Sequence, residues 1–210
     1  MWRRSGRAAK FAASNADVFK LRPLSEIDVT EPILLSTVSC SGRNYRSHNE
    51  EKASSPLSGR EPEFFIKTSD SVVGPGDGIV YDRKSIRKLD CEAELAIVIG
   101  RPGRHIPTET ALDHVIGYTI ANDVTARDRQ VRKTAEGVVF YELGRGKAFD
   151  SSLPIGPVIT TSDDIPDPQS LTLETVINRE LRQSANTSDM IWSCADLIHF
   201  FSCNFTLRPL

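Results

Sequence analysis

The chain has 210 residues, with 26 lysines and arginines against 28 acidic residues, a formal net charge of −2 and 39% hydrophobic residues. This composition suits one globular domain with a proper core and room for a small extra segment. The charge argues against a nucleic-acid binder held by bulk electrostatics, and no apolar run approaches the roughly 18 residues that a membrane span needs.

The start of the chain is weakly patterned, so we expect residues 1–34 to be a weakly structured segment before one domain at residues 35–210. Its first sixteen residues contain four basic residues and no acid. That bias resembles a mitochondrial presequence, and the alternative is a frayed basic tail. The four cysteines form no CxxC pair and fit no zinc spacing, which predicts reduced, mostly buried thiols. We expect a cytoplasmic protein, with the mitochondrion as the alternative compartment.

The first predicted elements are strands separated by polar segments. Residues 35–41 read as a strand that ends in a glycine turn, and the polar residues 45–58 read as a helix or a mobile loop. Residues 63–67 form a short strand. Residues 72–82 read as strand, tight turn and strand, because Gly-Pro-Gly-Asp-Gly is turn chemistry.

The second half of the chain alternates strands with short helices. Residues 91–99 are a nearly continuous apolar strand. Residues 108–115 are helical, with Thr108 as the cap and Ala111, Leu112 and Val115 as an apolar stripe. Residues 116–130 run from a strand into a helix or turn, residues 153–161 and 171–178 are strands, and residues 194–202 are a helix. Because strands outnumber helices in a mixed order, we predict an α+β domain on a folded mixed sheet.

Two carboxylates lie at the start of the strand predicted at residues 91–99. Glu92 and Glu94 are two residues apart and therefore project from the same face of a strand. Unpaired buried carboxylates repel, so either one is protonated or a cation lies between them. Asp123 follows another apolar strand and is a third candidate ligand for a hard cation such as Mg²⁺, Mn²⁺ or Ca²⁺. The alternatives are solvated glutamates at a strand start and a turn or capping aspartate.

Several motifs in a fixed order carry a family resemblance. They are LDCEAELAIVIG (89–100) with GYTIANDVTARD (117–128), GRNYRSHNEE (42–51), FFIKTSDSVVGPGD (64–77), GKAFDSSLPIGPVI (146–159) and INRELRQSANTSDMIW (177–192). The set resembles the fumarylacetoacetate hydrolase family, in particular its acylpyruvase, oxaloacetate decarboxylase and hydroxymuconate-isomerase-like members. The resemblance implies the mixed β-sheet roll of the family's C-terminal domain.

The resemblance also implies roles for individual residues. Glu92, Glu94 and Asp123 match the ligands of Mg²⁺ or Mn²⁺. The residues implied in catalysis are His48 and Glu51, as a dyad, and Lys147. The residues implied in substrate binding are Arg127, Gln130 and Tyr45. From the residues alone, His48 and Glu51 lie on one face if this segment is a helix, and the alternative is a solvated polar helix. The alternative for Lys147 is surface solvation. Arg127 and Gln130 likewise read as a surface ion pair and a surface amide.

The activity that the resemblance implies is divalent-metal-dependent cleavage of a C–C bond in a small 2-oxo acid through a metal-bound enolate. Candidate substrates are an acylpyruvate, a fumarylacetoacetate-like compound and oxaloacetate. Keto–enol isomerisation by the same kind of site is the alternative, and family members imply a homodimer.

The chain departs from the family pattern at several places, of which two bear on the fold. Residues 205–210 begin like a T-L-x-P-G-D turn and stop at Leu210, so we expect a C-terminally truncated domain that lacks its closing strands and has weak or no turnover. A non-catalytic partner of a full-length homologue is the corresponding alternative function. Asn178-Arg179-Glu180 replaces an Asn-Gly hairpin turn, which predicts a positive φ at Arg179.

Overall fold

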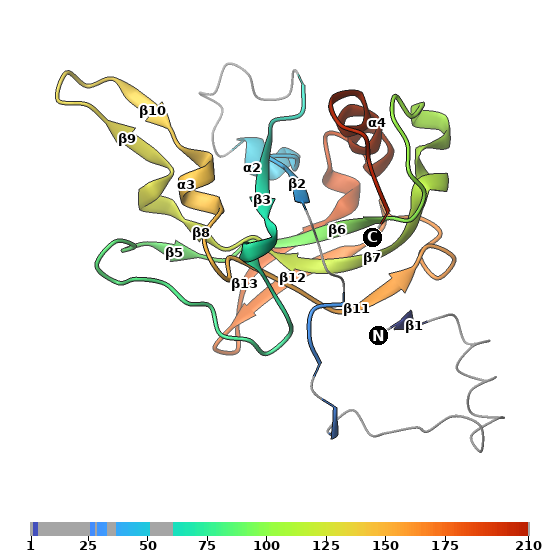
Figure 1. Cartoon of the computed structure of the whole chain (residues 1–210), viewed down its shortest axis with the longest axis horizontal. Coiled ribbons are helices and arrows are strands. Elements are labelled where there is room, and N and C mark those ends of the chain that lie inside the picture. The colour runs from blue at the N-terminus through green and yellow to red at the C-terminus, as the bar shows by residue number, and fades with distance from the viewer. Residues whose placement is uncertain (1, 4–25, 28, 33–36, 51–60, 210) are drawn as a thin grey trace.

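A mixed β-sheet forms the centre of the molecule in the computed structural model, which describes residues 2–3, 26–27, 29–32, 37–50 and 61–209. Its strand order is β1 (Trp2–Arg3), β11 (Leu153–Thr161), β7 (Val115–Asn122) and β6 (Ala93–Ile99), and β4 (Val72–Val73) also pairs with β11. β7 runs antiparallel to both β6 and β11, whereas β1 and β4 are parallel to β11. The predicted α+β class and mixed sheet are confirmed (Figure 1).

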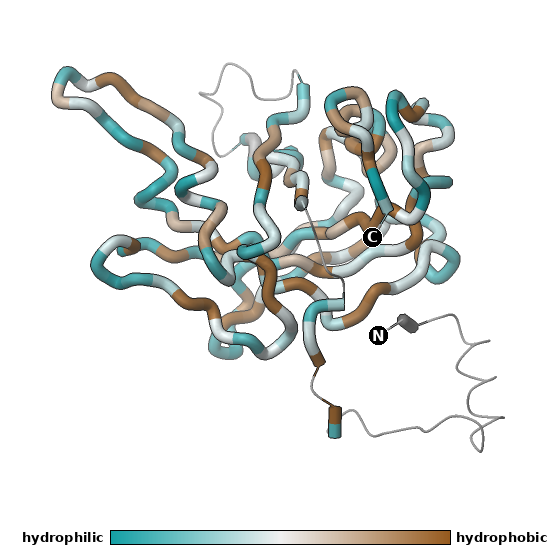
Figure 2. Tube along the Cα trace, viewed as in Figure 1, coloured by the Kyte–Doolittle hydropathy of each residue, from teal (hydrophilic) through white to brown (hydrophobic). Residues whose placement is uncertain are grey.

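Four two-stranded ribbons surround the central sheet. They are β2 (Thr37–Ser41) with β3 (Phe64–Thr68), β5 (Leu89–Asp90) with β8 (Thr125–Ala126), β9 (Val131–Lys133) with β10 (Val139–Tyr141), and β12 (Thr172–Ile177) with β13 (Glu180–Asn186). The hairpin β9–β10 projects from the body at the upper left of Figure 1. Its exposed residues include Phe140 and Tyr141, which agrees with the hydrophobic stretch along this hairpin in Figure 2.

The helices are short. The α-helices are α2 (Arg46–Glu50), α3 (Leu143–Lys147) and α4 (Cys194–Asn204), and the 3₁₀ helices are η2 (Ser69–Ser71), η3 (Thr108–His114), η4 (Arg127–Arg129) and η5 (Thr187–Asp189). The start of α4 is fixed by a capping box, in which Ser193 and Asp196 each bind the other's backbone N–H. None of the helices in the described ranges is long and apolar enough to cross a membrane.

The two faces of the pair β6–β7 have different neighbours. Tyr118 belongs to a core cluster with Ile198 of α4 and residues of η3, and Leu95 and Ile97 pack against it. On the opposite face, Ala96 packs against a cluster that includes Ala121 and Leu153. Strand alternation places Glu94 on this second face, with Ala96. The Glu94 side chain, at the start of β6, therefore lies on the side of the sheet that faces β2 and β3.

Several boundaries differ from the predictions. The second strand within residues 72–82 is absent, and the strand expected at 91–99 begins at Ala93. Residues 108–114 form a 3₁₀ helix whose N-cap is Pro107 rather than Thr108, and Leu112 is exposed. The positive φ at Arg179 is confirmed at 69°. Most of residues 1–34 lie outside the described residues.

Candidate active site

Lys147 is the centre of a buried charge cluster. It is the last residue of α3, and its Nζ lies 2.5 Å from Oε2 of Glu92 and 2.5 Å from Oδ2 of Asp123. Glu92 directly precedes β6 and Asp123 directly follows β7, and the Asp123 N–H donates to the Glu92 carbonyl at 2.8 Å. The antiparallel register of β6 and β7 thus brings the two acids together from positions about thirty residues apart. The structure thus brings together Glu92, Asp123 and Lys147, three of the predicted site residues, while the roles assigned to them stay predictions.

A second lysine, Lys67 of β3, lies behind Asp123. Its side chain is fully buried, and its Nζ is 2.9 Å from Asp123 Oδ1. The same ammonium donates to the carbonyls of Lys147 at 2.5 Å and Ser152 at 2.8 Å. Sequence reasoning missed Lys67 as a site residue. The available signal was the strand FFIKT, in which Lys67 shares the inward face with Phe65.

Glu94 is the acid with the most perturbed protonation. Burial raises the pKa of its carboxyl to about 8, and the negative charges of Glu92 and Asp123 act in the same direction. Burial also raises the pKa of Glu92, but the Lys147 ammonium and then Arg127 outweigh burial, so that this pKa is lowered overall. Glu92 is therefore ionised at neutral pH while Glu94 holds a proton. The sequence argument required a protonated glutamate or a cation between Glu92 and Glu94. Protonation of Glu94 meets it, and the Lys147 ammonium lies instead between Glu92 and Asp123.

Arg127 and Gln130 line the same region. Arg127, at the start of η4, pairs with Asp90 at 2.9 Å and also contacts Glu92. The Gln130 backbone and side chain lie against Gly146, where an added Cβ would come within 2.4 Å of Gln130 Cγ. The lack of a side chain at Gly146 therefore allows α3 to approach η4 closely, which brings Lys147 into the cluster.

The segment that contains Tyr45 and His48 docks on the residues before α4. Asn44 is buried and binds Trp192 in both directions, with two hydrogen bonds of 2.9 Å, and Tyr45 forms a β-bridge with Met190. Burial and the charge of Glu94 together raise the pKa of the Tyr45 hydroxyl. The segment is therefore close enough to Glu94 to sense its charge. His48 lies in α2, as its predicted helix requires, whereas Glu51 lies outside the described residues.

The oxygen donors fit a hard cation in their chemistry. Two carboxylate oxygens, Glu92 Oε2 and Asp123 Oδ2, converge on one nitrogen, and Oδ1 of Asp123 lies 2.9 Å from Lys67 Nζ. As the described side chains stand, no three of the types His, Cys, Asp and Glu are gathered closely enough to hold a metal ion. The carboxylates are held by Lys147 and Lys67 instead. The set Glu92, Glu94 and Asp123 stays a prediction.

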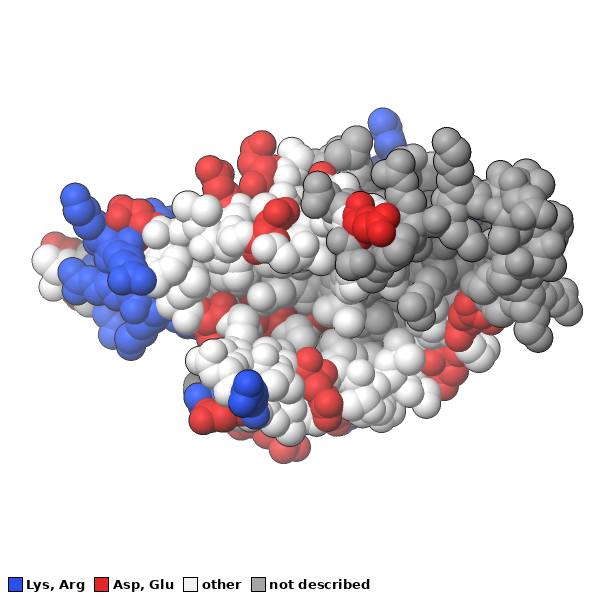
Figure 3. All heavy atoms as spheres, turned by 90° about the horizontal axis from the view of Figure 1, so that it is seen from below, with Lys and Arg blue, Asp and Glu red and all other residues white. Residues whose placement is uncertain are grey.

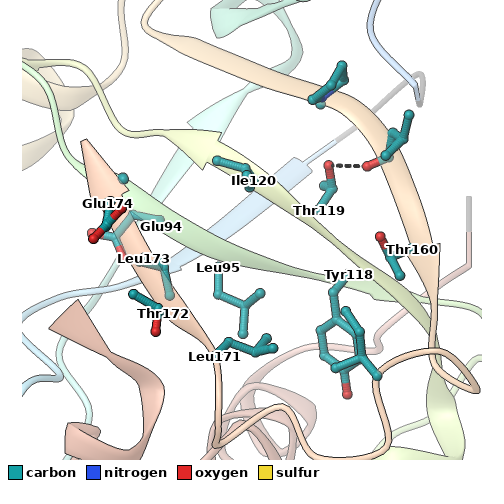
Figure 4. A pocket seen from close by; sticks show the side chains of 15 residues that line it. Glu94, Leu95, Tyr118, Thr119, Ile120, Thr160, Leu171, Thr172, Leu173 and Glu174 are labelled. Carbon is teal, nitrogen blue, oxygen red and sulfur yellow. Dashed lines mark hydrogen bonds between the residues drawn. The ribbon is translucent and has the colours of Figure 1, made fainter. Parts of the chain in front are cut away.

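A cavity of about 260 Å³ lies beside β6, β7, β11 and β12. Figure 4 shows Leu95, Tyr118, Leu171 and Leu173 around it, and Thr119 donating a hydrogen bond to the Val158 carbonyl at 2.7 Å. Glu94 is one of the few ionisable residues in its lining. This largely apolar space does not suit a small dicarboxylate, so the chemistry belongs to the charge cluster rather than to the cavity.

Comparisons with known proteins agree with the motif-based resemblance. Residues 37–210 match the family of the fumarylacetoacetate (FAA) hydrolase C-terminal domain. Oxaloacetate tautomerase YisK of Bacillus subtilis is 41% identical over 187 residues, which are 88% of this chain and 60% of that protein. The mitochondrial oxaloacetate tautomerase FAHD2A of Homo sapiens is 38% identical over 188 residues, which are 89% of this chain and 57% of that protein.

Solved structures are similar as well. The 5-carboxymethyl-2-hydroxymuconate delta-isomerase from Mycobacterium smegmatis has a TM-score of 0.76 at 35% identity, covering 90% of this chain and 70% of that chain. The present chain thus spans about 60% of the length of the curated relatives that it matches.

Proposed function

We propose, on the premise that this chain belongs to the fumarylacetoacetate hydrolase family, that it catalyses keto–enol tautomerisation of a small 2-oxo acid of the oxaloacetate type. The observation that carries the proposal is the Lys147 ammonium, buried between Glu92 and Asp123 at 2.5 Å from each. A buried cation at this place can neutralise the oxygen on which negative charge develops during enolisation. The names of the tautomerase and isomerase relatives support the same class of reaction.

Tautomerisation moves one proton between carbon 3 and the 2-oxo oxygen, without the addition of water. In our proposal, His48 takes the proton from carbon 3, with Glu51 orienting its imidazole. Lys147 donates a hydrogen bond to the 2-oxo oxygen while the charge develops, and return of the proton to this oxygen completes the enol. Arg127, Gln130 and Tyr45 hold the substrate.

A divalent cation is part of the proposal. Mg²⁺, Mn²⁺ or Ca²⁺ would be held by Glu92, Glu94 and Asp123, and when bound it supplies Lewis-acid polarisation of the 2-oxo group. Binding of the cation requires Glu94 to lose the proton that burial favours. We therefore expect apparent affinity for the cation to rise with pH towards about 8.

The surface charge near the cluster favours an anionic substrate. Lysines and arginines gather at the left end of the face shown in Figure 3. This is the end of the molecule where the β9–β10 hairpin lies in Figure 1. The loop before β5 lies at this end too, on the side seen in Figure 3, and its exposed basic residues are Arg83, Lys84, Arg87 and Lys88. A basic surface raises the local concentration of a dianion such as oxaloacetate.

Hydrolysis of a C–C bond in an acylpyruvate is the second candidate. It is favoured by the hydrolase for which the matched family is named, and it would use the same buried ammonium to stabilise the enolate that leaves. Decarboxylation of oxaloacetate would use that enolate too. These reactions differ from tautomerisation in their products, since only they release pyruvate.

The test is a product assay on the 210-residue chain with Mg²⁺. Enol-oxaloacetate, keto-oxaloacetate and an acylpyruvate are supplied separately, and enol absorbance and released pyruvate are followed. We expect faster loss of the enol signal without pyruvate, and loss of this acceleration in Lys147→Met. Acylpyruvate hydrolysis would favour the second candidate, and no acceleration of any of these reactions by the folded chain would refute both.

Assembly and compartment belong to the same proposal. We infer a homodimer that acts on a small molecule in the cytoplasm, with the mitochondrion as the alternative. The word mitochondrial in the name of the human relative supports the alternative. Sedimentation of the purified chain and imaging of a tagged protein test the two points.

A further inference from the structure

We propose that the Lys147 ammonium and a divalent cation are alternative occupants of one site, so that loading the cation releases Lys147 for catalysis. This inference rests on the cation in the proposed function and adds a competitor to it. In the structure, the Lys147 ammonium occupies the position between Glu92 and Asp123 that the cation would take. The divalent cation then acts as an activator as well as a participant.

The contacts of Lys147 show why it is blocked. An ammonium has three N–H donors. Two of them are directed to Glu92 Oε2 and Asp123 Oδ2, both at 2.5 Å. The ring of Phe65 lies on another side, with its centroid 5.0 Å from Nζ. A lysine held in this way has little donor capacity left for the oxygen of a substrate.

Each of the two carboxylates has a second cation that does not depend on Lys147. Oδ1 of Asp123 is 2.9 Å from Lys67 Nζ, and Oε1 of Glu92 contacts Arg127. Departure of the Lys147 ammonium therefore leaves both acids paired on their far sides. The oxygens that it vacates, Oδ2 and Oε2, are the two that converge on one point.

The backbone of Lys147 is held separately from its side chain. Two donors hold its carbonyl oxygen: Lys67 Nζ at 2.5 Å and Ser152 Oγ at 2.8 Å. The end of α3 can therefore stay in place while the four methylene groups of the side chain rotate. A divalent cation carries twice the charge of the ammonium, so the two ionised carboxylates attract it more strongly at the same distance.

Calorimetric titration of the full chain with Mn²⁺ or Mg²⁺ tests the competition without measuring activity. Lys147→Met removes the competitor, and we expect the dissociation constant to fall about tenfold or more. Arg145→Met is the matched control, because it removes one positive charge from the same helix and its ion pair is with Glu142. We expect Arg145→Met to stay within about twofold of the wild type. Equal or weaker binding by Lys147→Met would overturn the competition.

Lysine labelling of the wild type gives a second readout that needs no variant. Acetylation by an amine reagent, followed by peptide mass spectrometry, is compared with and without Mn²⁺. We expect labelling of Lys147 to increase severalfold with the cation, while exposed Lys84 and buried Lys67 do not change. Unchanged labelling of Lys147 at saturating Mn²⁺ would contradict its release.

The two proposals fail in different ways. If wild type and Lys147→Met bind the cation with the same affinity, the competition is wrong and cation-assisted tautomerisation stands. If neither protein binds Mg²⁺ or Mn²⁺ at millimolar concentration, the binding of a divalent cation is refuted in both proposals. Tautomerisation by the protein's own residues is then tested by the product assay alone.

Discussion

At the scale of single residues, Asp123 pairs with two buried lysines, Lys67 and Lys147, so its charge bears on stability. Asp123→Asn would leave the fully buried Lys67 beside an uncharged amide. We expect a loss of about 3–5 kcal/mol in the free energy of unfolding, because a buried charge loses its counter-ion. Urea denaturation of the wild type and the variant, in the presence of a chelator, measures this difference in the free energy of unfolding.

Glu94→Gln is the matched control for this change. Its carboxyl already carries a proton at neutral pH, since its pKa lies at about 8, so we expect a change of less than about 1 kcal/mol. Equal losses for Asp123→Asn and Glu94→Gln would contradict the assignment of Asp123 as the ionised partner.

The pH dependence of stability should report on Glu94. Its pKa is raised from 4.5 to about 8 in the folded chain, so the folded state binds the extra proton within this range. The contribution of Glu94 is fully present below about 4.5 and is lost as the pH rises through about 8. In chelator, the wild type should lose stability relative to Glu94→Gln over this window. Parallel curves for the two proteins would show that Glu94 titrates normally.

Spacing in the sequence led to the acids but not to Lys67. Glu92 and Glu94 could be predicted because a two-residue period and an apolar strand are local signals. A single lysine in a strand has no such signal, because its burial is decided by distant segments. Its partners Asp123 and Ser152 are far from it in sequence. Lys147 was identified through the motif around it rather than from its own environment.

At the scale of elements, the β12–β13 hairpin contains a turn that its residues do not favour. Asn178 and Arg179 have φ of 53° and 69°. Asparagine tolerates this region, whereas the β-carbon of arginine is disfavoured there. Arg179 is also exposed, so little packing is lost when its side chain is removed.

We expect Arg179→Gly to stabilise the chain by about 0.5–1 kcal/mol, because relief of the positive φ exceeds the added entropy of the unfolded state. Thermal and urea unfolding measure the gain. Asn178→Gly serves as the control and should give a smaller change. A destabilised Arg179→Gly would show that the arginine makes a contact worth more than the backbone strain.

Element boundaries followed local patterns where those patterns were long. The strand at residues 153–161 and the helix at 194–202 were predicted almost as found, because each has an extended apolar pattern or a cap. The β9–β10 hairpin was missed, since its strands have only three residues each and are exposed. Such a short ribbon has no burial pattern from which it could be predicted.

At the scale of the whole molecule, the β12–β13 hairpin exposes an apolar pair. Val176 and Leu181 form a cross-strand pair on β12 and β13, and they are 60% and 58% exposed. Exposed apolar pairs promote association. We expect the chain to self-associate with rising concentration, and the double change Val176→Thr with Leu181→Thr to reduce this in sedimentation experiments. Unchanged association would assign it to another surface.

Solvent-exchange NMR tests the enolising site most directly, because tautomerase, decarboxylase and hydrolase chemistry all pass through an enolate. The chain and Mg²⁺ are added to oxaloacetate in D₂O, and the loss of the carbon-3 proton signal is followed. We expect exchange about 10²-fold or more above the spontaneous rate, and a rate near the spontaneous one for Lys147→Met. Exchange at the spontaneous rate with folded wild-type chain and saturating Mg²⁺ would contradict the proposed site.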